Sequence, residues 1–371
     1  MADNIPNEVM MKILVGLPVR TLLQIRCVCK SWCSLISSDN FVTFWFNRRT
    51  HLNSTHHLLL IKHYSEHEDQ EHFSLYLDDE SLTEYHLNLE NHPIANLSSY
   101  LTILGSCNGL VCLMDDMLKF TDILYLWNPT VRKFIVLPEP SITFSSHGPY
   151  ERALGFGFDS TTNDFKVVRI VYGSGGNEVD IYSLREGCWR SISVSGAIPD
   201  IHCESSHAYL NGAIHWVSRG GNYRLQIVSF NLGTKIFSEM ELPTSLGYIR
   251  LPRMLSVSVF HESLCVFHND SWERKVSIWV MKQYGVVDSW TNLFNLDFLR
   301  GSGKVIGLMR NGEVLLAHNE EMISTDSETQ YLKYLGIYGK GEAFSVNTYT
   351  ESLVLIDKPM RALHQNTSLG C

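Results

Sequence analysis

The sequence predicts an α+β multidomain chain with two unequal parts. A short N-terminal module of three helices precedes an all-β, propeller-like domain of six blades that both chain ends close. Three observations lead to this prediction. Apolar residues recur at helical spacing over 5–36. Beyond residue 100, turn residues separate apolar runs about every 50 residues, and equivalent strands carry aromatic side chains. The predicted boundaries are 1–45 for the helices, 46–57 for a connector, 58–360 for the β domain and 361–371 for a flexible tail.

The N-terminal module contains more large apolar groups than it can bury. Val9, Ile13 and Leu17 recur at helical spacing, and Pro18 ends this helix and can begin the next. The spacing resumes over 22–36. About 45 residues are too few to enclose such a set, so part of it must face the rest of the chain or another protein. A helical cap on the following domain remains the alternative.

The β domain is marked by hairpin turns. Asn108-Gly109, Asn211-Gly212 and Asn311-Gly312 separate apolar runs, as type I′ turns do. Similar turns at 159–163 and 261–262 lie halfway between them. An open β-sandwich or two smaller sheets remain possible on this pattern. The aromatic residues at equivalent strand positions are expected to pack between blades; they are Trp127, Tyr182, Phe230 and Trp279.

The predicted sixth blade combines strands that lie before and after the other five blades in the sequence. Apolar runs at 58–61 and 73–77 have no hairpin of their own, and a last hairpin at 350–351 leads to a strand at 353–356. Joining these strands would close the ring and remove its exposed edges.

Composition excludes several function classes. The chain has 371 residues, 44% of them hydrophobic, and a net charge of −9, which argues against binding nucleic acid and is compatible with a basic protein partner. Nine cysteines at scattered spacing, without a secretory signal, predict reduced thiols in the cytoplasm or the nucleus. No apolar run is long enough for a membrane helix.

The sequence offers no chemistry of its own: we expect no catalytic residue, cofactor or metal. No nucleophile-elbow, zinc-protease or P-loop pattern is present. The histidine-rich stretch 51–72 is interpreted as a solvated connector, and the acidic residues 78–80 as a solvated loop. The short glycine pair at 155–157 is interpreted as a turn or a strand contact. Three cysteines are interpreted as small buried apolar groups: Cys27, Cys29 and Cys33.

Two segments resemble known domains. The first resembles a plant F-box, with Ile5-Pro6 in place of the usual Leu-Pro; its motifs are Ile5-Pro6, Leu17-Pro18, Leu22-Leu23 and Val28-Cys29-Lys30-Ser31-Trp32. The second resembles the F-box-associated, kelch-like domain of plant F-box proteins, including the S-locus subgroup; its motifs are 105–112, 126–130, 154–159, 163–169 and 277–281. Paired glycines fall irregularly, which is unlike a regular kelch array.

This resemblance implies a substrate-recognition subunit of a Skp-cullin-F-box (SCF) ubiquitin ligase. The F-box would dock a Skp-type adaptor, and through it a cullin and a RING protein, while the propeller would bind a target protein. The S-locus subgroup makes a basic self-incompatibility ribonuclease one candidate target. The adaptor-binding residues that the resemblance implies are Ile5, Pro6, Val9, Ile13, Leu17, Pro18, Leu22, Leu23, Val28, Cys29 and Trp32.

Target contacts are expected in the loops of the propeller, because rigid scaffolds commonly carry their binding residues on loops. The large residues of the loops at 141–152, 218–224 and 244–253 are the candidates: His147, Tyr150, Arg152, Tyr223, Tyr248 and Arg250. Loops at 173–178 and 197–206 could also contribute. Two other functions remain open: a propeller enzyme or small-molecule binder with a helical cap, and a scaffold that binds the adaptor without ubiquitination.

Overall fold

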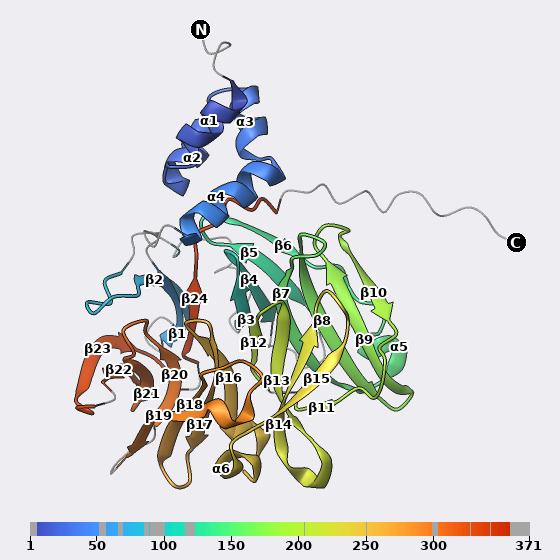
Figure 1. The fold of residues 1–371 in the computed structure, drawn as a ribbon, viewed down its shortest axis with the longest axis vertical. Coiled ribbons are helices and arrows are strands. Elements are labelled where there is room, and N and C mark those ends of the chain that lie inside the picture. The colour runs from blue at the N-terminus through green and yellow to red at the C-terminus, as the bar shows by residue number, and fades with distance from the viewer. Residues whose placement is uncertain are drawn as a thin grey trace, which may run out of the picture.

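A computed structural model describes residues 6–51, 57–65, 70–84, 89, 101–115, 123–203, 205–249, 251–298, 303–326, 328–341 and 343–356. Within this part of the chain, helices precede strands as predicted (Figure 1). Four helices form the N-terminal module, and the fourth continues through residues 46–51 of the expected connector. They are α1 (Asn7–Leu14), α2 (Val19–Ile25), α3 (Lys30–Ile36) and α4 (Asp39–His51).

The helical module has a small core of its own, which one distant residue completes. Trp45 is buried and its Nε1–H donates a hydrogen bond to Leu17 O at 3.2 Å. Leu353, 2% exposed, reaches this core from the far end of the chain. The remaining buried members are Leu14, Val15, Val19, Leu22, Ile36 and Phe41. The module is therefore packed onto the propeller by sequence-distant contacts.

The strands of the described residues form six antiparallel sheets, the blades of a propeller. Blades 1 to 5 follow in chain order. Blade 1 has β3 (Leu101–Cys107), β4 (Leu110–Asp115), β5 (Leu124–Asn128) and β6 (Lys133–Val136); blade 2 has β7 (Glu151–Asp159), β8 (Asp164–Gly173), β9 (Gly176–Ser183) and β10 (Cys188–Ile192). Blade 3 has β11 (Asp200–Ile201), β12 (His207–Leu210), β13 (Ala213–Arg219), β14 (Leu225–Asn231) and β15 (Phe237–Glu241); blade 4 has β16 (Leu255–Phe260), β17 (Ser263–Asp270), β18 (Lys275–Met281) and β19 (Trp290–Asp297). Blade 5 has β20 (Gly303–Leu308), β21 (Val314–His318), β22 (Glu321–Thr325) and β23 (Leu332–Tyr338).

Both chain ends form the closing blade, as predicted. β24 (Ser345–Tyr349) pairs with β1 (Leu58–Ser65), which pairs with β2 (Gln70–Leu77). The register places Leu58 opposite both Tyr349 and Leu77. Pairing of the two ends removes the open edge that an unclosed array would leave.

The segment after β24 differs from the prediction. Residues 353–356 form no strand. Instead, the Asn128 side-chain amide donates hydrogen bonds to Ser352 O at 3.2 Å and Val354 O at 2.9 Å. The predicted strand was wrong because this apolar run serves two cores. Leu353 enters the helical module, and Ile356 packs in the cluster between blades 1 and 2.

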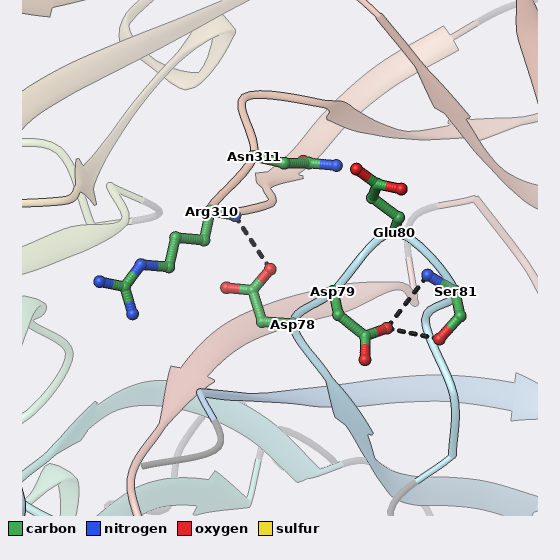
Figure 2. A pocket seen from close by; sticks show the side chains of 6 residues that line it. All are labelled: Asp78, Asp79, Glu80, Ser81, Arg310 and Asn311. Atoms are coloured by element: carbon green, nitrogen blue, oxygen red, sulfur yellow. Dashed lines mark hydrogen bonds between the residues drawn. The ribbon is translucent and has the colours of Figure 1, made fainter. Parts of the chain in front are cut away.

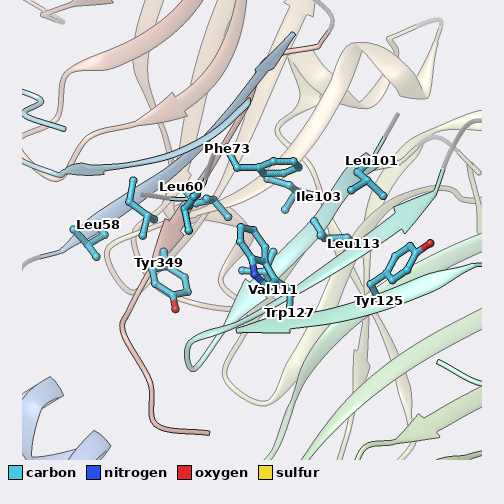
Figure 3. Close-up of a cluster of buried hydrophobic side chains, with 12 residues drawn as sticks. Leu58, Leu60, Phe73, Leu101, Ile103, Val111, Leu113, Tyr125, Trp127 and Tyr349 are labelled. Carbon is cyan, nitrogen blue, oxygen red and sulfur yellow. The ribbon is translucent and has the colours of Figure 1, made fainter. Parts of the chain in front are cut away.

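Aromatic and aliphatic side chains fill the junctions between blades, as predicted. Trp127 is fully buried between the closing blade and blade 1, where Phe73 meets its ring edge-on with 5.5 Å between centroids (Figure 3). Tyr182 and Phe230 are also buried, and Trp279 is half-buried. The glycine pair at 155–157 is confirmed as a strand contact: a Cβ on Gly155 would lie 2.5 Å from the Trp216 ring.

Two local expectations change. Asn108 and Asn211 adopt the positive φ that a type I′ turn requires, but in Asn311-Gly312 only the glycine does, with φ 93°. The described parts of the histidine-rich stretch 51–72 are mostly regular structure rather than a connector: His51 ends α4, and residues 58–65 and 70–72 belong to β1 and β2. His63 in β1 and His72 in β2 stack with 5.2 Å between ring centroids.

Candidate functional site

The helical module keeps several large apolar side chains open to solvent. Val28 is 69% exposed, Ile13 59% and Val9 46%. They lie on or just before short helices whose other faces fill the module core, so no described segment covers them. We call Val9, Ile13 and Val28 the open apolar surface. Isolated exposed apolar residues are ordinary, but three on a module of this size indicate a docking surface.

The other residues predicted to contact an adaptor divide into three groups. Pro6, Pro18 and Cys29 are exposed, and Leu17, Leu23 and Trp32 are half-buried. The prediction that Leu22 contacts an adaptor was wrong. Its side chain is 0% exposed and belongs to the module core, because α2 turns this face toward Leu14 and Trp45. Ile5 lies outside the described residues.

The prediction that all three cysteines of the module are buried was also wrong. Cys27 and Cys29 are exposed and Cys33 is half-buried, so the first two are not buried apolar groups. Cys27 and Cys29 flank Val28 in the segment between α2 and α3. A hydrogen bond with the Ser31 hydroxyl, 3.1 Å from Cys29 Sγ, lowers the pKa of the Cys29 thiol.

The ring has two faces, which the connectivity distinguishes. The helical module sits on the face that carries the Asn108-Gly109 turn, since Gly109 lies against Ser352 just beyond β24. Strand direction alternates within each blade, so the loops after the second and fourth strands lie on the opposite side. We call that side the far face; α6 (Thr244–Gly247) lies on it, away from the helices (Figure 1). All the loops predicted to bind a target belong to the far face.

Two of the predicted target residues, Tyr150 and Arg152, are half-buried and contact other side chains of the protein. Tyr150 OH accepts a hydrogen bond from Arg169 Nη2 at 2.6 Å, and its ring stacks on Phe144 at 4.1 Å between centroids. Arg152 is half-buried, with Nη2 3.6 Å from Met114 Sδ. These two side chains shape the loop around α5 (Phe144–His147).

Arg169 is a buried residue that sequence reasoning missed. Its Nη1 lies 3.0 Å from Asp180 Oδ2, and Nη2 donates to Ile142 O at 2.8 Å. The β8–β9 register places Arg169 directly opposite Asp180, so a strand-pairing argument could have found the pair. Both charged groups are almost fully buried, which marks them as a structural anchor for the loop above.

The remaining predicted target residues point outward. Tyr223 is 84% exposed and Tyr248 72% exposed. His147 is also exposed, with Nδ1 2.7 Å from Ser146 Oγ. Arg250 lies outside the described residues. The structure thus brings Tyr223 and Tyr248 to one region of the far face, whereas His147 lies on another blade junction.

A shallow pocket of about 620 Å³ lies between the closing blade and blade 5 (Figure 2). Two of its three carboxylates accept backbone hydrogen bonds, one from another blade and one within a local turn. Asp78 Oδ1 accepts the Arg310 backbone N–H at 2.9 Å, and Asp79 Oδ1 accepts the Ser81 backbone N–H at 3.0 Å. Burial raises the pKa of Asp78, while the Ser81 hydroxyl lowers that of Asp79. The remaining lining residues are Glu80 and Asn311.

No metal-ligand cluster stands out: among the described residues, no group of three or more His, Cys, Asp or Glu side chains could hold a metal ion. In the same part of the chain, no helix combines the length and the apolar character needed to cross a membrane.

Comparisons with known proteins find two matching domain families and several similar chains. The F-box associated beta propeller domain family matches residues 43–356, and the F-box-like family matches residues 2–47. F-box protein At3g07870 of Arabidopsis thaliana is 27% identical, with 96% of this chain and 93% of that protein covered. The F-box/kelch-repeat protein At3g23880 of the same plant is 28% identical over 80% of this chain and 82% of its own length. TolB of Acinetobacter baumannii, a solved structure, has a TM-score of 0.47 at 13% identity and covers 84% of this chain and 72% of its own.

Helices with an open apolar surface on a closed ring of blades define a two-part protein with a docking module and a large scaffold. The chain belongs to the family of proteins with an F-box associated beta propeller domain, here preceded by an F-box-like segment.

Proposed function

We propose that this protein is the substrate-recognition subunit of an SCF ubiquitin ligase. The helical module would dock a Skp-type adaptor, and the far face of the propeller would hold a target protein. The single observation that carries the proposal is the open apolar surface: Val9, Ile13 and Val28 stay exposed beside a well-filled core. A partner's apolar groove would cover these side chains, as in other helix-in-groove contacts.

The proposed work of the chain is positioning. A target held on the propeller would lie near a conjugating enzyme carried by the cullin and RING proteins, which raises the effective concentration of its lysines. A fixed geometry between module and ring serves this role. Leu353 in the module core and the Asn128 contacts to Ser352 and Val354 support such a fixed geometry.

The proposal assigns no catalytic step to this chain and places it in the cytoplasm or the nucleus. A basic self-incompatibility ribonuclease is one candidate target, and only the resemblance to the S-locus subgroup supports it. A scaffold that binds the adaptor without ubiquitination would share the same docking surface. A target's half-life with and without Ile13→Asp/Val28→Asp separates these two functions.

Docking can be tested with the full chain and a purified Skp-type adaptor. Retention on the immobilised adaptor is measured for the unaltered chain and for Ile13→Asp/Val28→Asp. Both side chains are exposed, so the substitutions leave the module core intact. We expect retention to fall at least about tenfold, because a carboxylate would have to enter an apolar contact.

Matched controls come from the propeller. Ile236 and Val136 are 50% and 55% exposed, so Ile236→Asp/Val136→Asp introduces the same charges at similar exposure. This control should keep full retention. Equal retention of all three proteins, or no retention of the unaltered chain, would count against the docking proposal.

A further inference from the structure

One region of the far face combines exposed aromatic rings with an incompletely paired cation. Tyr223 ends the turn η2 (Gly221–Tyr223), and Tyr248 follows α6. The Arg224 guanidinium lies 5.6 Å from the centroid of the Tyr248 ring. Arg253 is exposed on the next turn, η3 (Pro252–Met254). We call Tyr223, Arg224, Tyr248 and Arg253 the tyrosine–arginine surface.

The loop that carries Tyr223 is built to hold this side chain outward. Tyr223 has φ 59°, a left-handed conformation that a bulky residue rarely adopts. The loop is closed by Gly220 N–H donating to Arg224 O at 2.8 Å, and Gly220 leaves room for Gln226, whose Oε1 lies 2.5 Å from where a Cβ would be. The Tyr223 ring is 84% exposed, so the strained backbone that holds it adds nothing to internal packing. Backbone strain of this kind is typical of binding sites.

The charge of the surface favours an anionic partner. Arg224 pairs with Glu241 at 3.2 Å, but that carboxylate is 64% exposed, and the buried Arg224 Nε–H has no hydrogen-bond partner among the described residues. Glu239 on β15 and Asp200, opposite Arg219 across the β11–β13 pair, are further acidic residues of this blade. The two loops that form the surface, 218–224 and 244–253, contain arginines and no Asp or Glu, in a chain whose net charge is −9.

We propose that the tyrosine–arginine surface binds an acidic peptide segment of a target protein. A carboxylate of that segment pairs with the Arg224 guanidinium in exchange for the exposed Glu241 carboxylate, because the planar guanidinium fork matches carboxylate geometry. An apolar residue beside it packs against Tyr223 and Tyr248, and tyrosine is among the residue types enriched at binding hot spots. This inference rests on the proposed function only in taking the bound protein to be a ubiquitination target.

The test selects peptides on the full chain. A phage-displayed library of random peptides of about twelve residues is selected on the immobilised protein, with the variant Tyr223→Ala/Arg224→Gln/Tyr248→Ala present in solution as competitor. We expect the recovered peptides to be enriched in Asp and Glu next to an apolar residue. Recovery of basic or uncharged peptides would overturn the proposal. So would a selection in which the variant in solution removes every bound peptide, because the altered residues would then not be needed for binding.

A second measurement assigns the binding to individual residues. The dissociation constant of a recovered peptide, measured by fluorescence anisotropy, should rise at least about tenfold for Arg224→Gln and for Tyr223→Ala/Tyr248→Ala. It should rise equally when the peptide's Asp and Glu become Asn and Gln. The control Tyr331→Ala/Tyr334→Ala removes two rings that are 76% and 60% exposed beside or on β23, and should leave the constant within about twofold.

Retention on the Skp-type adaptor separates the two proposals. The triple variant keeps the whole helical module, so it should be retained like the unaltered chain. Acidic peptides bound without adaptor retention would contradict the proposed function alone. Adaptor retention with unchanged peptide binding by Arg224→Gln would contradict this inference alone.

Discussion

The helical module and the propeller use similar apolar residues in different ways. In blade 1, Leu126 and Trp127 are fully buried because a neighbouring blade lies against each face of the sheet. In the module, Leu22 is equally buried but Val28 is 69% exposed. A closed ring supplies a neighbour for every sheet, whereas four short helices leave one side open. The difference indicates that the blades cover one another, whereas the module keeps an open side, which is where we propose that the adaptor docks.

The largest expected loss of stability comes from removing a side chain that is buried at a blade junction. Trp127→Ala removes a fully buried ring that packs edge-on against Phe73. We expect the free energy of unfolding to fall by about 3 to 5 kcal/mol, since the cavity cannot collapse between two sheets. Urea denaturation measures this loss. Trp272→Ala, at a residue 65% exposed, should change it by no more than about 0.5 kcal/mol; similar losses for both would contradict the packing.

The link between the two regions can be weakened at one residue. Leu353→Ala removes a side chain that is 2% exposed in the module core. We expect a loss of about 3 kcal/mol, as for other buried leucines. Hydrogen exchange should report the loss in α1 to α4 and spare β7 and β8. Uniform loss across the chain, or none in the helices, would show that Leu353 does not couple the parts. Leu293→Ala, at a residue 37% exposed, is the control.

Acidification should act on the ring through His215. This side chain is fully buried, and burial lowers its pKa to about 4 from about 6.5 when unfolded. Between these values the unfolded state binds more protons, so stability falls as the pH falls. From pH 7 to pH 5 we expect His215 to remove about 2 kcal/mol from the free energy of unfolding.

A substitution isolates this contribution. His215 Nδ1–H faces Ala208 O at 3.2 Å, and Nε2 accepts from Tyr284 OH at 2.8 Å. His215→Gln keeps a polar side chain that does not titrate. The difference in stability between pH 7 and pH 5 should therefore shrink by about 2 kcal/mol relative to the unaltered chain. An unchanged difference would rule out His215 as a source of the acid sensitivity.

The smallest effect is expected where the module is open. Val28→Ser shortens a side chain that is 69% exposed. The free energy of unfolding of the protein alone should change by no more than about 0.5 kcal/mol, because little apolar area returns to water. Thermal denaturation without any partner measures this. A loss of several kcal/mol would mean that Val28 is covered by this chain and is unavailable to an adaptor.

The repeat was predictable from sequence because its signals are local. Turn residues and equivalent aromatics such as Trp127 and Phe230 mark blades 1 to 4 within the sequence of each blade. The strand assignment of 353–356 failed because an apolar run does not say which core receives it. Leu353 goes to the helices and Ile356 to a blade junction, and both destinations depend on contacts far away in the sequence.

The open apolar surface was predictable only in part. Helical spacing identifies the apolar faces of the helices, but it does not say which face is buried. Leu22 faces a core that the distant Leu353 completes, whereas Val28 stays exposed. Arg169 and Asp180 were missed because their pairing depends on strand register. The prominence of Tyr223 depends on its positive φ, for which the sequence offers only a neighbouring glycine pair.

Hydrogen exchange with and without a purified Skp-type adaptor tests the central claim most directly. The account predicts added protection in the amides around Val9, Ile13 and Val28, with little change in η2 and α6 on the far face. Protection confined to the propeller loops, or no protection in the helices at saturating adaptor, would contradict the claim that the open apolar surface is where the adaptor docks.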